Sequence, residues 1–149
     1  MKLSTKGRYG ARAMLDLALN YNENEGPVAL GGVAERQGIS EEYLEQIFSA
    51  LRKAGIVESV RGAQGGYKLA RPAERITVGD ILRALEGSLT PVDCVDENKI
   101  TSCERYDGCV LNGVWAKLRD AINNTVDSIT LSDLVLQARS KQNEFMYYI

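Results

Sequence analysis

The chain has 149 residues, of which 44% are hydrophobic and 26% charged, and its formal net charge is −2. This size suits one compact core with an additional arm. The chain contains no histidine, which removes the commonest general base and any Ser/His or Cys/His catalytic pair, so we do not expect an enzyme. It has no run of 18 apolar residues and no visible secretory leader, so we expect a cytoplasmic protein without a membrane segment.

Basic residues are slightly in excess in the first half of the chain. Residues 1–75 contain 11 Lys and Arg against 9 Asp and Glu, whereas residues 76–149 contain 7 against 11. Binding to DNA phosphates depends on Lys and Arg. If the protein binds nucleic acid, the first half is therefore the expected site.

Three helices are expected between residues 7 and 55. Residues 7–22 carry apolar side chains at helical spacing, and the segment ENEGP (23–27) ends the pattern. A short second helix is ended by Gly38, and Ser40 is the expected N-cap of a third helix that stops at Gly55. Two helices joined by so tight a turn form a helix–turn–helix, whose second helix can enter the major groove of DNA.

A β-hairpin and a fourth helix are expected next. Residues 56–60 and 67–70 have strand composition, and the glycine-rich segment RGAQGG (61–66) between them favours a hairpin turn. A hairpin directly after a recognition helix is a wing. Residues 77–80 form a capping-box pattern that opens a helix ending at Gly87. The predicted fold is therefore mainly α with a small β-wing, and residues 1–87 are the predicted winged helix–turn–helix domain.

Three cysteines, Cys94, Cys103 and Cys109, lie in a polar segment without periodicity, residues 88–109. An odd number of cysteines in a reducing compartment argues against a disulfide framework. Three buried small hydrophobic residues would be the ordinary alternative, but such residues are not expected in one polar loop. Soft thiolates select zinc, copper(I) or iron–sulfur clusters, and the spacing does not separate zinc from iron–sulfur.

The last part of the chain, residues 110–149, is predicted to be a dimerisation helix followed by a tail. Apolar residues recur at helical spacing from Leu111 to Ile129, about five turns. A helix this long and apolar has little to pack against in a small chain, so a second copy is the expected partner. A final short helix is expected to start at residues 130–133, before the aromatic tail FMYYI (145–149).

The candidate DNA contacts lie on the third helix and the wing. Glu45 can accept a hydrogen bond from cytosine, Gln46 can pair with adenine, and Ser40 lies nearby. Arg61, followed by Gly62, is expected to meet phosphate or the minor groove; otherwise it belongs to a solvated turn. A basic cluster near the start is suited to phosphate contacts: Lys2, Lys6, Arg8 and Arg12.

Several segments together resemble the iron–sulfur cluster regulators of the IscR type, a winged-helix repressor family that also includes CymR. They are STKGRY (4–9), YLEQIF (43–48), LRK (51–53), VRG (60–62), GGY (65–67) and CVLNGVW (109–115). The resemblance implies a homodimer that crosses through the long helix and binds double-stranded promoter DNA. It also implies one 2Fe-2S cluster per chain on Cys94, Cys103 and Cys109, whose occupancy controls repression of iron–sulfur assembly genes.

Two features depart from that pattern. The family has a histidine ligand where this chain has Asn112, so the fourth ligand stays open among Asn112, Glu104, Asp107, solvent and the other protomer, and a 4Fe-4S cluster is a minor alternative. The tail resembles CymR-type repressors of cysteine metabolism, which act with a protein partner. The alternative function is therefore such a repressor, with a partner at the tail and zinc or nothing in the loop.

Overall fold

The computed structural model describes residues 2–100 and 103–147 of the chain. It is mainly helical with one two-stranded antiparallel sheet, as predicted. The helices and strands, in chain order, are α1 (Thr5–Asn20), α2 (Leu30–Gln37), α3 (Glu41–Lys53), β1 (Val57–Val60), β2 (Gly66–Leu69), η1 (Ala73–Arg75), α4 (Val78–Glu86), η2 (Asp93–Val95), η3 (Tyr106–Gly108), α5 (Val110–Asp127) and α6 (Leu131–Tyr147).

The helix–turn–helix is formed by α2 and α3. Gly38 ends α2 with a φ of 64°, a left-handed conformation that glycine adopts without strain. The Ser40 hydroxyl accepts a hydrogen bond from the backbone N–H of Tyr43 and so caps the start of α3. Both predicted caps are confirmed, because each depends on residues adjacent in the sequence.

The wing is an antiparallel hairpin in which Val57 pairs with Leu69 and Val60 with Gly66. It is held at two places. Val28, in the loop between α1 and α2, exchanges two backbone hydrogen bonds of 2.8 Å with Tyr67. The Tyr67 ring lies 4.9 Å from the ring of Phe48 on α3, measured between centroids. The wing is therefore fixed to the recognition helix.

One hydrophobic core lies between α1, α3, α4 and the hairpin. Its fully buried side chains come from α1, α2, α3, β1, α4 and the segments that adjoin them, and the first residue of α6 joins them: Met14, Leu17, Val33, Leu44, Ile47, Phe48, Leu51, Ile56, Val57, Ile76, Ile81 and Leu131. A buried carboxylate, Asp16, accepts hydrogen bonds from Arg36 and Gln37 and ties α1 to α2. The winged helix thus has a closed core, which the start of α6 completes.

The capping box at the start of α4 is present as predicted. The Thr77 hydroxyl accepts from the Asp80 backbone N–H, and the Asp80 carboxylate accepts from the Thr77 N–H. Burial alone would raise the pKa of Asp80, but these hydrogen bonds and the nearby charge of Arg71 outweigh it and lower the pKa. The charged form of Asp80 therefore stabilises the folded state.

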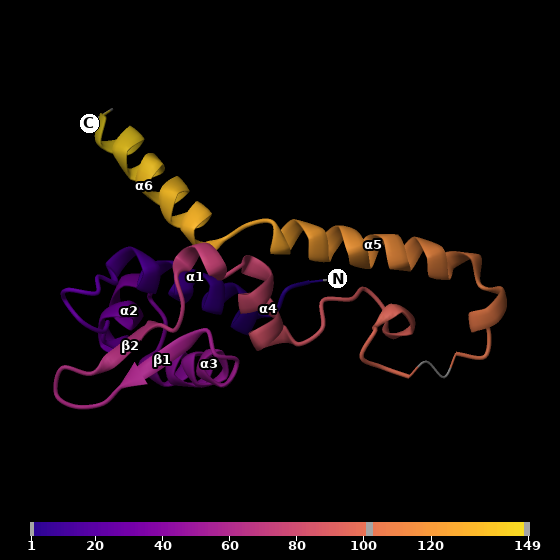
Figure 1. Ribbon diagram of the computed structural model, residues 1–149, viewed down its shortest axis with the longest axis horizontal. Coiled ribbons are helices and arrows are strands. Elements are labelled where there is room, and N and C mark those ends of the chain that lie inside the picture. Colours follow the sequence, from indigo (N-terminus) through magenta and orange to yellow (C-terminus); the bar gives the residue numbers. More distant parts are fainter. Residues whose placement is uncertain (1, 101–102, 148–149) are drawn as a thin grey trace.

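The two last helices leave the core in different directions (Figure 1). α5 has no buried residue. α6 is 17 residues long, so the prediction of a short final helix was wrong. Few of its side chains are buried beyond Leu131 and Val135, so periodicity gave little sign of its length. Tyr148 and Ile149 lie outside the described residues. Among the helices described, none is long and apolar enough to cross a membrane.

Candidate DNA-binding surface and cysteine loop

The recognition helix presents the predicted contact residues to solvent. Glu45 and Gln46 are exposed on α3, and Ser40 is exposed at its N-cap position. The opposite face of α3 is anchored in the core by Leu44, Ile47, Phe48 and Leu51. Because the buried face fixes how the helix is rotated, the polar face is held outward as a rigid surface.

The wing tip carries Arg61 and Gly62, both exposed. Gly62 has a φ of 113°, a conformation that side chains disfavour, so glycine is required for this turn. Gly65 is required for space, because a Cβ there would come 2.3 Å from the Val60 carbonyl oxygen. The turn thus presents the Arg61 side chain beyond the end of the hairpin.

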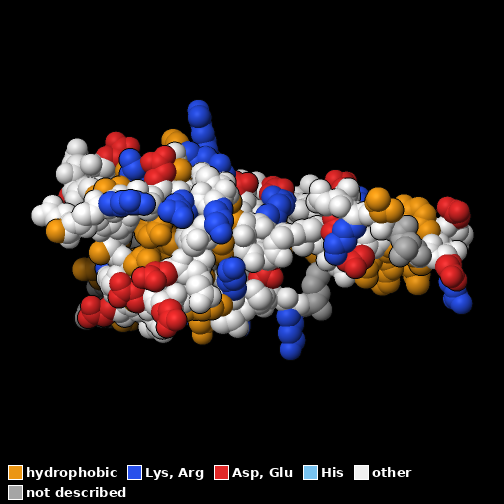
Figure 2. All heavy atoms as spheres, turned by 90° about the horizontal axis from the view of Figure 1, so that it is seen from below, with side chains coloured by type: hydrophobic (Ala, Val, Ile, Leu, Met, Phe, Trp, Pro, Cys, Tyr) orange, Lys and Arg blue, Asp and Glu red, His pale blue; other side chains and the backbone are white. Residues whose placement is uncertain are grey.

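The predicted basic cluster lies at the beginning of α1. Arg12 donates a 2.8 Å hydrogen bond to the Gln37 carbonyl oxygen and lies 5.5 Å from the centre of the Tyr9 ring. These contacts place its charge beside the end of α2. Figure 2 shows Lys and Arg side chains in a row across the winged-helix half, beside a group of Asp and Glu. Such a row of basic side chains suits contacts to DNA phosphates.

The cysteine loop, residues 88–109, lies beside α5 and contains the short turns η2 and η3. Cys103 and Cys109 are exposed, and Cys94 is partly buried. Cys94 and Asn112 line the same hollow of about 220 Å³. Among the residues described, no three His, Cys, Asp or Glu side chains are close enough together to hold a metal ion. The expected convergence of the three cysteines is not seen in this arrangement.

The side chains of the loop nevertheless suit a metal ion or cluster that prefers thiolate ligands. Three thiols are the ligand type that zinc and iron–sulfur clusters prefer. The Nδ2 of Asn112 is buried and has no hydrogen-bond partner among the described residues, and such an orphaned donor indicates a missing acceptor. An acceptor in the hollow beside Cys94 would satisfy it. Binding through all three thiols requires the loop to change shape.

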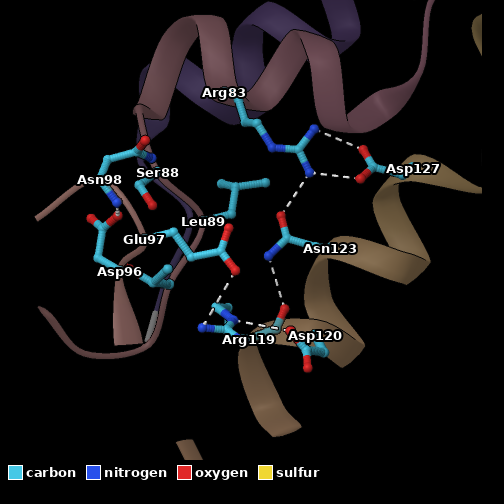
Figure 3. A pocket seen from close by; sticks show the side chains of 11 residues that line it. Arg83, Ser88, Leu89, Asp96, Glu97, Asn98, Arg119, Asp120, Asn123 and Asp127 are labelled. Carbon is cyan, nitrogen blue, oxygen red and sulfur yellow. Dashed lines mark hydrogen bonds and ion pairs between the residues drawn. The ribbon is translucent and has the colours of Figure 1, made fainter. Parts of the chain in front are cut away.

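A polar joint that the sequence did not reveal connects α4, α5 and the loop (Figure 3). Arg83 of α4 donates to both carboxylate oxygens of Asp127, at 2.7 and 2.8 Å, and to the Asn123 side-chain oxygen at 2.6 Å. Asn123 donates to the carbonyl oxygen of Arg119, whose guanidinium donates to the Val95 carbonyl oxygen at 2.9 Å. The joint surrounds a cavity of about 320 Å³.

The hydrogen bonds of this joint to carboxylates stabilise the charged forms of its two arginines. The hydrogen bond from Arg83 to Asp127 raises the pKa of Arg83, and the hydrogen bond to Asp120 raises that of Arg119. Arg119, Asn123 and Asp127 are spaced by four residues and so lie on one face of α5. That spacing could be recognised in the sequence. The pairing with Arg83, about 40 residues away, could not.

Residues 3–137 of the chain match the Rrf2 family, described as iron-dependent transcriptional regulators. The chain belongs to the Rrf2 family. It is 42% identical over 149 residues to the regulator CymR of Bacillus subtilis, covering 100% of both chains. It is 44% identical over 135 residues to the regulator IscR of Escherichia coli, covering 91% of this chain and 80% of that one.

The solved structure of T. potens IscR is 50% identical and has a TM-score of 0.75, covering 95% of this chain and 91% of that one. The predicted winged-helix fold is confirmed by this likeness. The relatives are named as transcriptional regulators, so this Rrf2 protein is a DNA-binding transcription regulator and not an enzyme. Both IscR and CymR are among them, so membership establishes that role and not the signal that controls it.

Proposed function

We propose that this Rrf2 protein is a cytoplasmic, homodimeric repressor whose promoter binding is controlled by an iron–sulfur cluster in the cysteine loop. The observation that carries the proposal is the loop itself. Every thiol of the chain lies there, and beside Cys94 the side-chain nitrogen of Asn112 is buried without a hydrogen-bond partner among the described residues. The family description as iron-dependent regulators supports the same conclusion. Genes for iron–sulfur cluster assembly are the proposed targets.

The proposed ligands are Cys94, Cys103 and Cys109, with one cluster per chain, 2Fe-2S in preference to 4Fe-4S. A bound cluster supplies a group whose presence depends on iron, oxygen and redox state. Asn112 lines the hollow beside Cys94, and the oxygen of its amide is one candidate for the fourth position, although an amide is a weaker ligand than a thiolate or carboxylate. Glu104 and Asp107 are exposed in the same loop and remain candidates for the fourth position, with solvent and the other protomer.

The proposed DNA contacts are Ser40, Glu45 and Gln46 on the recognition helix, and Arg61 with Gly62 on the wing. Their exposure on rigid elements supports these roles. The division into a winged helix (1–87), a cysteine loop (88–109) and a dimerisation region (110–149) is likewise proposed.

The proposed dimer interface is the apolar face of α5. Its side chains Val110, Leu111, Val114 and Leu118 are exposed in the single chain, with Val110 at 87% and Leu111 at 54%. Figure 2 shows hydrophobic side chains gathered at that end of the molecule. An exposed apolar stripe of this length marks an interaction site. A second copy pairs identical stripes, and two recognition helices then address two half-sites of a promoter.

The second candidate is a repressor of cysteine metabolism controlled by a protein partner. Two observations favour it: 42% identity to CymR over the whole chain, and the exposure of Phe145 and Met146 near the end of α6. In that case the partner binds the tail, and the loop holds zinc or no group.

The deciding experiment is the visible spectrum of protein purified without oxygen, together with analysis of iron and sulfide. The control is the variant in which all three cysteines are alanine. About two iron and two sulfide per chain, absent from the variant, are expected. A colourless wild-type protein that still binds promoter DNA would overturn the cluster proposal and favour the cysteine-metabolism repressor.

A further inference from the structure

One face of α5 joins the cysteine loop to the DNA-binding domain. It bears Asn112 and Arg119 at the loop end, and Asn123 and Asp127 at the α4 end. The exposed apolar side chains of α5 lie elsewhere on the helix, so this polar stripe is separate from the proposed dimer interface. We call Asn112, Arg119, Asn123 and Asp127 the polar stripe.

At the loop end, the stripe is bonded to the residue that follows a cysteine. The Arg119 guanidinium donates to the carbonyl oxygen of Val95, directly after Cys94, and lies 3.8 Å from the Glu97 carboxylate. The Arg119 side chain is 20% exposed and Glu97 is 80% exposed, so the hydrogen bond to the Val95 carbonyl oxygen is better shielded from water than the ion pair. A displacement of the Val95 carbonyl group, which directly follows Cys94, would therefore either move Arg119 or break this hydrogen bond.

At the other end, the stripe is clamped to α4. Arg83 binds Asp127 through both nitrogens of its fork, a geometry that fixes orientation as well as distance. Asn123 links this clamp to Arg119 through the helix backbone. Figure 3 shows the side chains in one row between the two helices and the loop.

The adjoining backbone provides a pivot for α5. The Val78 N–H donates to the Ile129 carbonyl oxygen at 2.9 Å, and the Leu131 N–H donates to the Ile76 carbonyl oxygen at 2.7 Å. These two bonds hold the connection between α5 and α6 at the start of α4. With this connection fixed, the clamp and the Arg119 contact set the angle of α5 relative to the winged helix.

Gly79 makes room for the clamp. A Cβ at this buried helical position would come 2.0 Å from a carboxylate oxygen of Asp127 and 2.8 Å from Arg83. The close neighbours are ends of side chains, so alanine displaces the clamp and leaves the helix backbone undisturbed. The α4 backbone and the Asp127 carboxylate therefore lie together only because residue 79 has no side chain.

We propose that the polar stripe, clamped by Arg83, couples the state of the cysteine loop to the DNA affinity of the winged helix. The coupling rests on the proposed function, in which the loop changes shape when it binds a group through three thiols. That change displaces Cys94 and Val95, Arg119 carries the displacement to α5, and the Arg83 clamp carries it to α4. In the dimer, the angle of α5 sets how the two recognition helices are spaced.

The test measures the dissociation constant for a fluorescent promoter duplex by anisotropy, with each protein in two states. One state is reconstituted with iron and sulfide under nitrogen, and the other is stripped by a chelator. The ratio of the two constants is the coupling ratio. The variants are Gly79→Ala, which displaces the clamp, and Arg119→Gln, which removes the loop contact. Gly113→Ala is the matched control, because this helical glycine on α5 has open space around its Cβ position.

The wild-type coupling ratio is expected to differ from one by at least about fivefold, and both variants should bring it to within about twofold of one. Gly113→Ala should keep the wild-type ratio. Arg119→Lys, which retains a charged donor, should keep more of the ratio than Arg119→Gln. Iron content and thermal midpoint should stay near wild-type values, which separates loss of coupling from loss of the cluster or the fold. Because Gly79→Ala and Arg119→Gln act on one path, the double variant should lose little more than either.

Two results would overturn the proposal, and they are distinguishable. A wild-type ratio far from one that survives in both variants means that the loop controls DNA binding by another route; the proposed function then stands without the relay. A wild-type ratio of one means that the loop does not control DNA binding, and the proposed function and the relay then fail together.

Discussion

The winged helix and the α5 region differ in how completely each one buries its apolar side chains. The winged helix buries Phe48, Met14 and their neighbours in one core, and each of its helices and strands has side chains in this core or packed against it. α5 is longer than any helix of that domain, yet it has no buried residue. Helices with exposed apolar stripes are stable in proteins when another surface covers them. The first region therefore buries its apolar side chains within one chain, whereas the second leaves an apolar stripe uncovered, which is the basis of the proposed dimer.

The same contrast applies to polar groups. In the winged helix, the buried Asp16 accepts hydrogen bonds from two side chains. At the cysteine loop, the Asn112 amide is buried without a partner among the described residues. Buried polar groups are nearly always satisfied in the functional state of a protein. The unpaired Asn112 nitrogen therefore supports the proposal that a group binds beside the cysteine loop.

Truncation of the central core residue is expected to have the largest effect. Phe48→Ala removes a fully buried ring from the winged helix and should lower the free energy of unfolding by about 3–5 kcal/mol. Urea denaturation at one fixed protein concentration measures it. Gln46→Ala, on the exposed face of the same helix, should change stability by less than about 0.5 kcal/mol. Equal losses in the two variants would contradict the description of the core.

Leu111→Ala tests whether the exposed apolar side chains of α5 form the dimer interface. The side chain is half exposed in one chain and is proposed to be buried in the dimer, so its loss should weaken dimerisation by about 1.5–3 kcal/mol. Sedimentation velocity over a concentration series gives the dimer dissociation constant. Asn124→Ala, at an exposed polar position of α5, is the control and should leave it unchanged. An unaltered dimer in Leu111→Ala would place the interface elsewhere.

Glu45→Ala tests whether the exposed face of α3 in the winged helix recognises DNA bases. If Glu45 accepts a hydrogen bond from cytosine, the variant should lose about 1–3 kcal/mol of discrimination at one base pair. Competition among duplexes with single base-pair changes measures it. Glu41→Ala, in the first turn of the same helix, should leave base preference unchanged. A uniform loss at all sites would show that Glu45 does not read sequence.

Asp80, at the start of α4, is expected to make stability depend on pH. Because its pKa is lowered in the folded state, its stabilisation is fully present above the unfolded value of about 3.9 and is lost as pH falls through the folded pKa. Asp80→Asn keeps an acceptor for the Thr77 N–H but does not titrate. Its unfolding free energy should fall less than that of the wild type between about pH 5 and pH 2, by about 1 kcal/mol for this partly exposed group. Identical pH profiles would contradict the assignment.

Arg61→Ala should have the smallest effect, confined to the wing. If Arg61 meets a phosphate, the variant should bind DNA more weakly at every sequence, and the slope of log affinity against log salt should become shallower by about 0.9. Titrations at several salt concentrations measure this slope, with Gln64→Ala as a neighbouring control in the same turn. An unchanged slope and affinity would exclude the wing contact.

Features that depend on neighbouring residues were predictable from the sequence. The Ser40 cap, the left-handed Gly38 and the capping box of Thr77 and Asp80 are each decided within four residues. The candidate DNA contacts followed from the same local periodicity, because the buried face of α3 leaves the other face exposed. The length of α6 could not be predicted, because too few of its side chains are buried to produce a periodic pattern.

The sequence by itself determined the winged-helix order, the caps, the apolar stripe of α5 and the confinement of all three thiols to one loop. Each follows from local propensity, from periodicity or from composition. The tertiary structure alone decided the contacts between distant segments: Asp16 with Arg36, Arg83 with Asp127, and Arg119 with the carbonyl group of Val95. Charged side chains are common all along the chain, and which of them meet depends on how helices pack through their apolar faces. Packing therefore selects the pairs, and two of them, Arg83 with Asp127 and Arg119 with Val95, connect α4, α5 and the cysteine loop.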